Sequence, residues 1–211
     1  MPENIFYRAK RTAAALFSRR CVSCGKTFSG RQCLCAECTK KLKPVKSFFC
    51  EEYLACAAYS YEAPARDVML RFKFNDDYES CIDTLSDWLC AGFDKYLSDE
   101  SFDFAVSVPA FGATPRMELF VRDFARRRGL CYRPELLFKI RPTEKQHRLS
   151  AEERRTNLRG AFAASAAVCG KKILLIDDIY TTGSTVRECT RALCAAGASM
   201  VCVLTVLKTE D

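Results

Sequence analysis

The sequence predicts an α/β protein with a mostly parallel sheet, preceded by a small cysteine-rich module. Three observations lead to this prediction. Apolar runs typical of buried strands alternate with segments of helical periodicity along most of the 211 residues. The apolar run Ile173–Ile176 ends at two adjacent acids, Asp177 and Asp178, which a glycine-containing turn follows. Five of the 14 cysteines fall between Cys21 and Cys38.

The N-terminal cysteines form two Cys-x-x-Cys pairs with ten residues between them, Cys21 with Cys24 and Cys35 with Cys38. Two thiolate pairs at this spacing can close a tetrahedral Zn²⁺ site. So short a module buries too little apolar surface to fold alone, so we expect a structural zinc ion to hold it. Cys33 competes with Cys35 as a ligand, and reduced thiols without a metal are the alternative interpretation.

Basic residues are concentrated in the first fifth of the chain. Residues 1–50 hold 11 Lys and Arg against 2 Asp and Glu, a net charge of +9, whereas residues 51–211 have a net charge of −2. We therefore place the zinc module in residues 1–50, together with an N-terminal helix, and the α/β domain in residues 51–211. The charge is typical of a surface for nucleic acid or another polyanion, and a solvated basic face is the alternative.

The chain contains no apolar run of the ~18 residues that a transmembrane helix needs. The apolar stretch Ala13–Phe17 is also too short for the core of a secretory signal. We therefore expect a cytoplasmic protein with no membrane span.

The elements of the α/β domain are expected from apolar periodicity and from the residues that end each segment. Pro44 interrupts Lys43–Phe49, which we interpret as a linker. Gly129 and Gly197 end two of the helices. The expected elements are strand Tyr53–Tyr61, helix Ala65–Phe74, helix Cys81–Leu97, strand Phe104–Val108, helix Met117–Arg128, strand Lys171–Ile176, helix Thr185–Ala196 and strand Met200–Leu207.

The segment after the acids has the chemistry of a phosphate site. Its turn, Thr181-Thr182-Gly183-Ser184-Thr185, offers backbone N–H groups and hydroxyls at the start of a helix, where an anion is favoured. Gly183 lets the backbone approach the phosphate closely. Asp177 and Asp178 suit a pair of sugar hydroxyls, so the segment predicts a ribose 5-phosphate site. An ordinary strand, turn and helix explains the turn but not the adjacent acids.

A polar and basic stretch, Thr143–Phe162, precedes this motif. It is either a loop that closes over a pyrophosphate group or a solvated helix in which Glu152 and Glu153 pair with neighbouring arginines. We interpret His147, the only histidine, as a surface residue and not as an acid or base.

Four segments of the chain, in this order, resemble the ComF family of competence proteins, which are phosphoribosyltransferase-like proteins associated with DNA uptake. They are the cysteine pairs, the segment YSYEAPARDVMLRFKF at 59–74, the run from Gln146 to Asn157, and the motif IDDIYTTGST at 176–185. The similarity extends from the first cysteine pair to Leu207.

The resemblance implies a type I phosphoribosyltransferase fold that binds phosphoribosyl pyrophosphate (PRPP) together with Mg²⁺. It adds Lys73 and the loop Ser107-Val108-Pro109 to the residues expected to bind PRPP, and it favours Arg154 as the residue that stabilises the leaving pyrophosphate. The other matches to the family are Gln146, Leu149, Asn157 and Gly160-Ala161-Phe162.

One segment departs from the family pattern. Family members carry Arg-Gly-Phe-Asn-Gln at the start of the helix after that loop, whereas this chain has Arg116-Met117-Glu118-Leu119-Phe120. Only Arg116 matches. The acceptor side of the site is altered if the missing Asn and Gln contact the nucleobase or the pyrophosphate.

Two functional hypotheses follow. In the first, the chain is a PRPP-binding phosphoribosyltransferase-type protein that displaces pyrophosphate from ribose C1, with Asp177, Asp178 and Arg154 as its catalytic residues. In the second, it is a non-catalytic adaptor in natural transformation, whose zinc module contacts single-stranded DNA or a DNA-uptake helicase.

Overall fold

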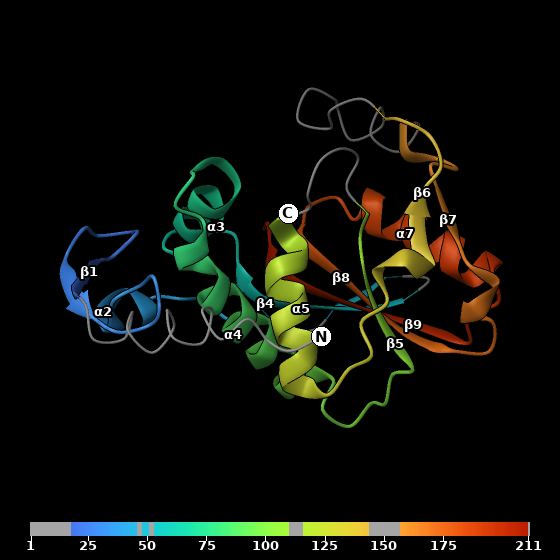
Figure 1. Cartoon of the computed structure of the whole chain (residues 1–211), viewed down its shortest axis with the longest axis horizontal. Helices are drawn as coiled ribbons and strands as arrows, with labels where there is room; N and C mark the ends of the chain where they lie inside the picture. The colour runs from blue at the N-terminus through green and yellow to red at the C-terminus, as the bar shows by residue number, and fades with distance from the viewer. Residues whose placement is uncertain (1–17, 46–47, 51–52, 110–115, 144–156, 211) are drawn as a thin grey trace, which may run out of the picture.

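The computed structural model describes residues 18–45, 48–50, 53–109, 116–143 and 157–210 (Figure 1). The central sheet of this part of the chain has the strand order β3-β4-β9-β8-β5. Strands β4, β9, β8 and β5 are parallel, and β3 pairs antiparallel with β4. The mostly parallel sheet is therefore confirmed. The strand bounds are Phe48–Cys50 (β3), Tyr53–Ser60 (β4), Phe104–Ser107 (β5), Lys172–Tyr180 (β8) and Met200–Lys208 (β9).

Helices cover both faces of the sheet, as Figure 1 shows. Three helices pack on one face, and α7 packs on the other beside the short antiparallel pair β6 and β7. The helix bounds are Ala65–Phe74 (α3), Glu79–Tyr96 (α4), Arg116–Arg128 (α5) and Ser184–Ala195 (α7). Strand β6 is Leu137–Lys139 and β7 is Phe162–Ala164, with 3-10 turns at Pro134–Leu136 and Ala166–Val168.

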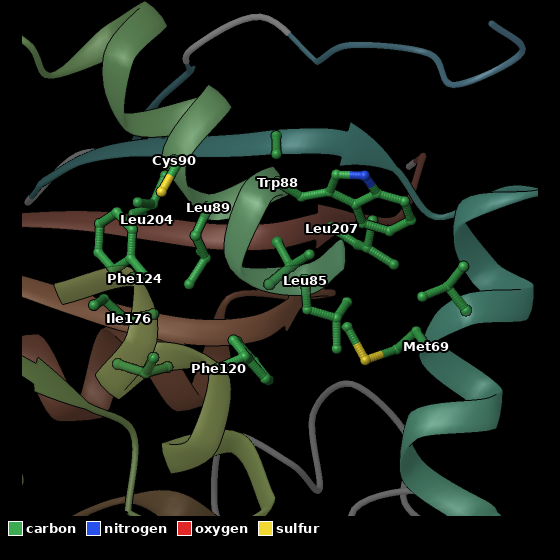
Figure 2. Close-up of a cluster of buried hydrophobic side chains, with 14 of the residues drawn as sticks. Met69, Leu85, Trp88, Leu89, Cys90, Phe120, Phe124, Ile176, Leu204 and Leu207 are labelled. Carbon is green, nitrogen blue, oxygen red and sulfur yellow. The ribbon is translucent and has the colours of Figure 1, made fainter. Parts of the chain in front are cut away.

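The two faces explain why β8 has an uninterrupted apolar run. Successive side chains of a strand point to opposite faces, so a strand covered on both faces needs apolar residues throughout. Leu174 and Ile176 belong to the cluster under α3, α4 and α5, whereas Ile173 and Leu175 belong to the cluster under α7. Figure 2 shows Ile176 in the first cluster, with leucines of α4 and phenylalanines of α5.

The N-terminal module consists of β1 (Ser18–Arg20), β2 (Thr27–Ser29) and α2 (Ala36–Thr39). Its buried side chains belong to the same apolar cluster as those of α3, α4 and α5. Polar contacts add to this packing, because Ser23 Oγ donates to Asp67 Oδ2 (2.7 Å) and the Cys33 N–H donates to Thr84 Oγ1 (2.9 Å). The module is thus packed against the α/β body.

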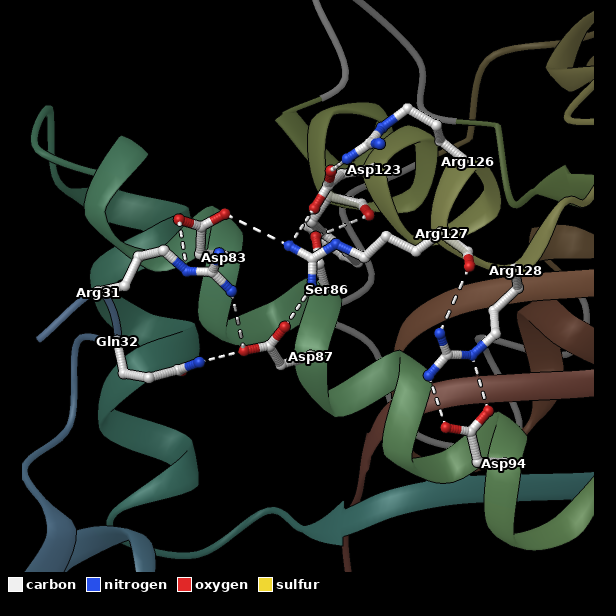
Figure 3. Close-up of polar contacts among 11 residues, drawn as sticks. Arg31, Gln32, Asp83, Ser86, Asp87, Asp94, Asp123, Arg126, Arg127 and Arg128 are labelled. Carbon is white, nitrogen blue, oxygen red and sulfur yellow. Dashed lines mark hydrogen bonds and ion pairs between the residues drawn. The ribbon is translucent and has the colours of Figure 1, made fainter. Parts of the chain in front are cut away.

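An ion-pair network links the module to α4 and α5 (Figure 3). The largely buried guanidinium of Arg127, on α5, pairs with Asp83 (3.4 Å) and Asp87 of α4 and with Asp123 of its own helix. Arg31 of the module reaches the same two α4 carboxylates, at 3.6 Å from Asp83 and 3.9 Å from Asp87. Because Arg127 neutralises carboxylates on two helices, its loss would leave these acids with fewer cationic partners.

The structure differs from the sequence prediction in three places. The prediction of a linker over Lys43–Phe49 was wrong at the end of this segment, where β3 forms an antiparallel edge strand beside β4. Strand β8 does not end at Ile176 but continues through the acids to Tyr180. The pair β6 and β7 was not predicted. The four helices were predicted to within two residues at each end. Over the described ranges, none of the helices is both long and apolar enough to cross a membrane.

Candidate functional site

The two acids lie at the carboxyl end of the sheet, just beyond the point where β5 stops. Strand β5 pairs with β8 only as far as Ser107 opposite Ile176. Asp177 and Asp178 continue β8 with β9 on one side, Asp177 lying opposite Thr205. The other edge of β8 is therefore open next to the acids within the described part of the chain. Ligands of parallel sheets bind at this end.

Lys73 lies beside the acids. Its Nζ is 2.8 Å from Asp178 Oδ2, although the two residues are far apart in the sequence. Both side chains are partly exposed. Lys73 comes from the last turn of α3, so the packing of α3 brings a cation to the acid pair.

Burial, and after it the neighbouring Asp178 carboxylate, raises the pKa of Asp177 from 3.8 to about 8. The N–H of Asp178, which donates to Asp177 Oδ1 (2.9 Å), and the Lys73 ammonium act in the opposite direction. Burial and the neighbouring carboxylate therefore favour the protonated form of Asp177 in the protein alone. Hydrogen-bond donors or a cation brought by a ligand would favour its ionised form.

The turn after β8 leads into α7 through a glycine with a positive φ. Gly183 has φ +70°, and a Cβ at this position would lie 2.2 Å from the hydroxyl of Tyr180. Gly183 precedes α7, so no side chain caps the first turn of the helix. Thr182 Oγ1 and Ser184 Oγ are 2.9 Å apart, and Thr181 and Thr182 are exposed. Amide and hydroxyl donors thus lie together at the positive end of α7.

The loop Ser107-Val108-Pro109 lies beside β8, since the Val108 N–H donates to the Ile176 carbonyl (2.9 Å). The Ser107 side chain is buried, and its Oγ is 2.7 Å from the hydroxyl of Tyr132. Burial raises the pKa of Tyr132 to about 12. Ser107 therefore offers the site its backbone more readily than its hydroxyl.

Several residues named from the sequence lie outside the described residues. They are Gln146, His147, Leu149, Glu152, Glu153 and Arg154. The expected N-terminal helix also falls on residues 1–17, outside the described ranges. The position of Arg154 relative to the acids thus stays a prediction.

The four cysteines predicted as zinc ligands come together in the module. The Sγ atoms of Cys21, Cys24, Cys35 and Cys38 all lie within 4.8 Å of one another. Three of the four are buried and Cys24 is exposed. This donor set, four thiols in a compact group, fits a structural zinc ion.

The pKa values of two of these thiols are shifted in opposite directions. For Cys21, burial is outweighed by backbone N–H groups, chiefly that of Cys24, which lower its pKa to about 6. For Cys38, burial and then the neighbouring thiols raise the pKa to about 12. Cys33 does not join this group: it is buried, and its backbone N–H bonds to Thr84 of α4.

Two residues near the acids were not singled out from the sequence. Tyr180 is buried, and its hydroxyl lies 3.3 Å from that of Tyr53 and against Gly183. The sequence could have indicated Tyr180, because it stands between the two acids and Gly183. Arg116 was noted only as a match to the family pattern, and its contacts could not be read from sequence.

Comparisons with known proteins bear on this arrangement. No family model matches the chain. It is 35% identical over 92 residues to the DNA utilization protein YhgH of Salmonella typhi, a match that covers 44% of this chain and 40% of that protein. The chain thus spans about two fifths of the length of this curated relative. It is also 26% identical over 194 residues to the competence protein ComFC of Streptococcus pneumoniae, covering 86% of this chain and 84% of that protein.

The chain is similar to ComFC over most of the length of both proteins. The resemblance to ComF proteins inferred from the motifs is therefore confirmed. A shorter match, 40% identical over 52 residues, links the chain to orotate phosphoribosyltransferase of Acinetobacter baumannii and covers 25% of this chain and 24% of that enzyme.

Two solved structures of phosphoribosyl enzymes match part of the chain. The PRPP amidotransferase of B. subtilis matches 65% of this chain and 30% of its own, at 23% identity and a TM-score of 0.43. Adenine phosphoribosyltransferase of Leishmania tarentolae matches 77% of this chain and 94% of its own, at 15% identity and a TM-score of 0.42. The predicted mostly parallel α/β domain with a four-cysteine module is confirmed by the sheet and by the cysteine group themselves.

Proposed function

We propose that this chain is a PRPP-binding protein of DNA uptake. One observation carries the proposal: the pair Asp177 and Asp178 at the open carboxyl edge of β8, followed at once by the Gly183 turn at the start of α7. Carboxylates suited to two sugar hydroxyls and donors suited to a phosphate are thereby separated by only a few residues, as a ribose 5-phosphate requires.

Each group then has a role in binding. Asp177 and Asp178 accept hydrogen bonds from the ribose hydroxyls, and the donors of Thr181–Thr185 hold the 5-phosphate. The ammonium of Lys73, already beside Asp178, and the backbone of Ser107-Val108-Pro109 face the pyrophosphate. The family resemblance predicts Arg154 as a further cation for it. Carboxylate oxygens are also suitable ligands for Mg²⁺, which would arrive with PRPP and neutralise its pyrophosphate.

If the protein catalyses turnover, the ribose C1–O bond to pyrophosphate breaks and a bond from an acceptor forms at C1. The transition state carries positive charge on the ribose, next to the acids, and negative charge on the leaving pyrophosphate, next to Lys73 and, by the prediction from the family resemblance, Arg154. Such a reaction depends on positioning and electrostatics and does not demand a general base.

A second candidate function rests on the module. Lys40 and Lys41 follow α2 and are both exposed. Their charges fit the phosphates of single-stranded DNA or an acidic surface of a helicase partner. In this function the PRPP site regulates an adaptor, and no acceptor is needed.

The test is a calorimetric titration of Mg²⁺ and PRPP into the protein and into a variant with Asp177→Asn and Asp178→Asn. The protein is expected to bind and the variant to lose most of its affinity. Failure of the parent protein to bind PRPP would contradict the proposal.

A further inference from the structure

Arg116 contacts the carbonyl groups at the C-terminal end of α3. It is the first residue of α5, and its Nη1 lies within hydrogen-bonding reach of the carbonyl oxygens of Phe72 (3.2 Å), Lys73 (3.3 Å) and Asn75 (3.0 Å). The last carbonyls of a helix have no N–H partner within the helix, and a cation is favoured at that end. The Arg116 guanidinium also lies over the ring of Tyr78, at 4.4 Å from its centroid.

The same end of α3 delivers Lys73 to the acid pair. The backbone carbonyl of Lys73 faces Arg116, while its ammonium is 2.8 Å from Asp178. The neighbouring Phe72 is fixed by edge-to-face packing on Phe120 of α5, with ring centroids 5.3 Å apart. Helix α5 therefore holds the backbone from which Lys73 reaches the acids.

We infer that Arg116 is a positioning residue for the proposed PRPP site: it fixes the end of α3 so that Lys73 stays on Asp178. This inference rests on the proposed function and deepens it. It gives Arg116 a different role from a direct contact to pyrophosphate. It also explains why the arginine can serve here without the Asn and Gln that accompany it in the family pattern, since its partners are the backbone of α3.

A double-mutant cycle separates the two roles. The variants are Arg116→Met, Lys73→Met and the double variant, each titrated with Mg²⁺ and PRPP after thermal unfolding confirms a folded protein. Arg116→Met alone is expected to weaken binding about tenfold. In the Lys73→Met background the same substitution is expected to change affinity less than about twofold, because Arg116 acts through Lys73. Arg116→Lys should recover part of the loss.

Two outcomes would overturn the inference. Equal losses in both backgrounds would mean that Arg116 contacts the ligand independently of Lys73. An unchanged affinity with a lower unfolding temperature would mean that Arg116 serves the fold alone. Arg126→Met, which removes the same charge from the same helix at a residue that pairs with Asp123, is the matched control and should bind PRPP like the parent.

A ligand-free measurement distinguishes failure of this inference from failure of the proposed function. Lys73 acetylation by acetic anhydride is followed by mass spectrometry, with exposed Lys41 as the internal reference. Arg116→Met is expected to speed labelling of Lys73 at least about threefold relative to Lys41, because the pair with Asp178 is loosened. An unchanged ratio would refute the positioning role, whether or not the parent protein binds PRPP.

Discussion

At the scale of single residues, Asp177 opposes the stability of the fold at neutral pH. Its pKa is raised from 3.8 to about 8, first by burial and then by the Asp178 carboxylate. Between these two values the folded protein binds more protons than the unfolded chain does. The contribution of Asp177 to the free energy of unfolding therefore falls as pH rises from about 4 to about 8, and it is constant above that range.

We expect Asp177→Asn to remove this penalty, since an amide has the same shape and no charge to desolvate. The variant should unfold at a higher temperature than the parent at pH 8, and the difference should shrink as pH falls toward 4. Thermal unfolding at several pH values measures this. A variant that is less stable than the parent at pH 8 would contradict the assigned acidity.

Asp103→Asn is a control of opposite sign. The Lys172 N–H, and then the Lys171 side chain, lower the pKa of Asp103. Its stabilising effect is present above its ordinary pKa and is lost as pH falls through its lowered value. Its replacement should therefore be slightly destabilising at pH 8 and neutral in strong acid.

At the scale of elements, the sequence predicted what depends on local pattern and missed what depends on pairing. The run Ile173–Ile176 is local and was correctly interpreted as a buried strand, and the local spacing of the cysteines correctly predicted that four of them come together. Strand β8 extends through Asp177 and Asp178 because β9 pairs with it there. Two adjacent acids in the sequence do not indicate such a continuation of the strand. Strands β6 and β7 lie over 20 residues apart in the chain, so no short turn sequence between them predicts that they pair.

Contacts between elements around the site were equally hidden. Lys73 was predicted to bind PRPP through family resemblance, but its pair with Asp178 depends on how α3 packs. The contacts of Arg116 with α3 likewise join residues over 40 positions apart. Such contacts are fixed by tertiary packing, which periodicity does not encode.

The module should contain one structural zinc ion. Purified protein is expected to contain about one zinc per chain, and Cys38→Ser should lose it together with the folded module, because a structural site is closed by all four ligands. Metal analysis and thermal unfolding under reducing conditions measure both effects. Cys33→Ala is the matched control and should keep its zinc. Metal-free protein that unfolds at the temperature of the parent would refute the assignment.

At the scale of the whole molecule, the net charge of +9 over residues 1–50 is only partly available to a partner. Lys26 pairs with Glu37 (2.7 Å), and Lys43 pairs with Glu62 (2.7 Å). Arg31 faces the carboxylates of α4. Lys40 and Lys41 after α2 are exposed, as is Arg20, so these residues of the described part of the module can meet a polyanion.

Changing Lys40 and Lys41 to Glu should weaken binding of single-stranded DNA by about tenfold or more and lower its salt dependence, since each lost phosphate contact reduces the slope by about 0.7. Fluorescence anisotropy at several salt concentrations measures both quantities. Changing Lys171 and Lys172 to Glu makes the same change in net charge outside the module and should have a smaller effect. Equal effects of the two double variants would show that overall charge, and not the module, attracts DNA.

The central claim is that Asp177 and Asp178 bind the ribose of PRPP, and calorimetric titration of Mg²⁺ and PRPP tests it most directly. Replacing both acids with Asn removes the charged acceptor of Asp178, worth about 1.5–3 kcal/mol, and the acceptor that Asp177 becomes when the ligand favours its ionised form, so affinity should fall at least about tenfold. Asp103→Asn, at the opposite end of the sheet, should bind like the parent. Unfolding at pH 8 verifies that the double variant is folded. If that folded variant binds PRPP as tightly as the parent does, the account of this site is wrong.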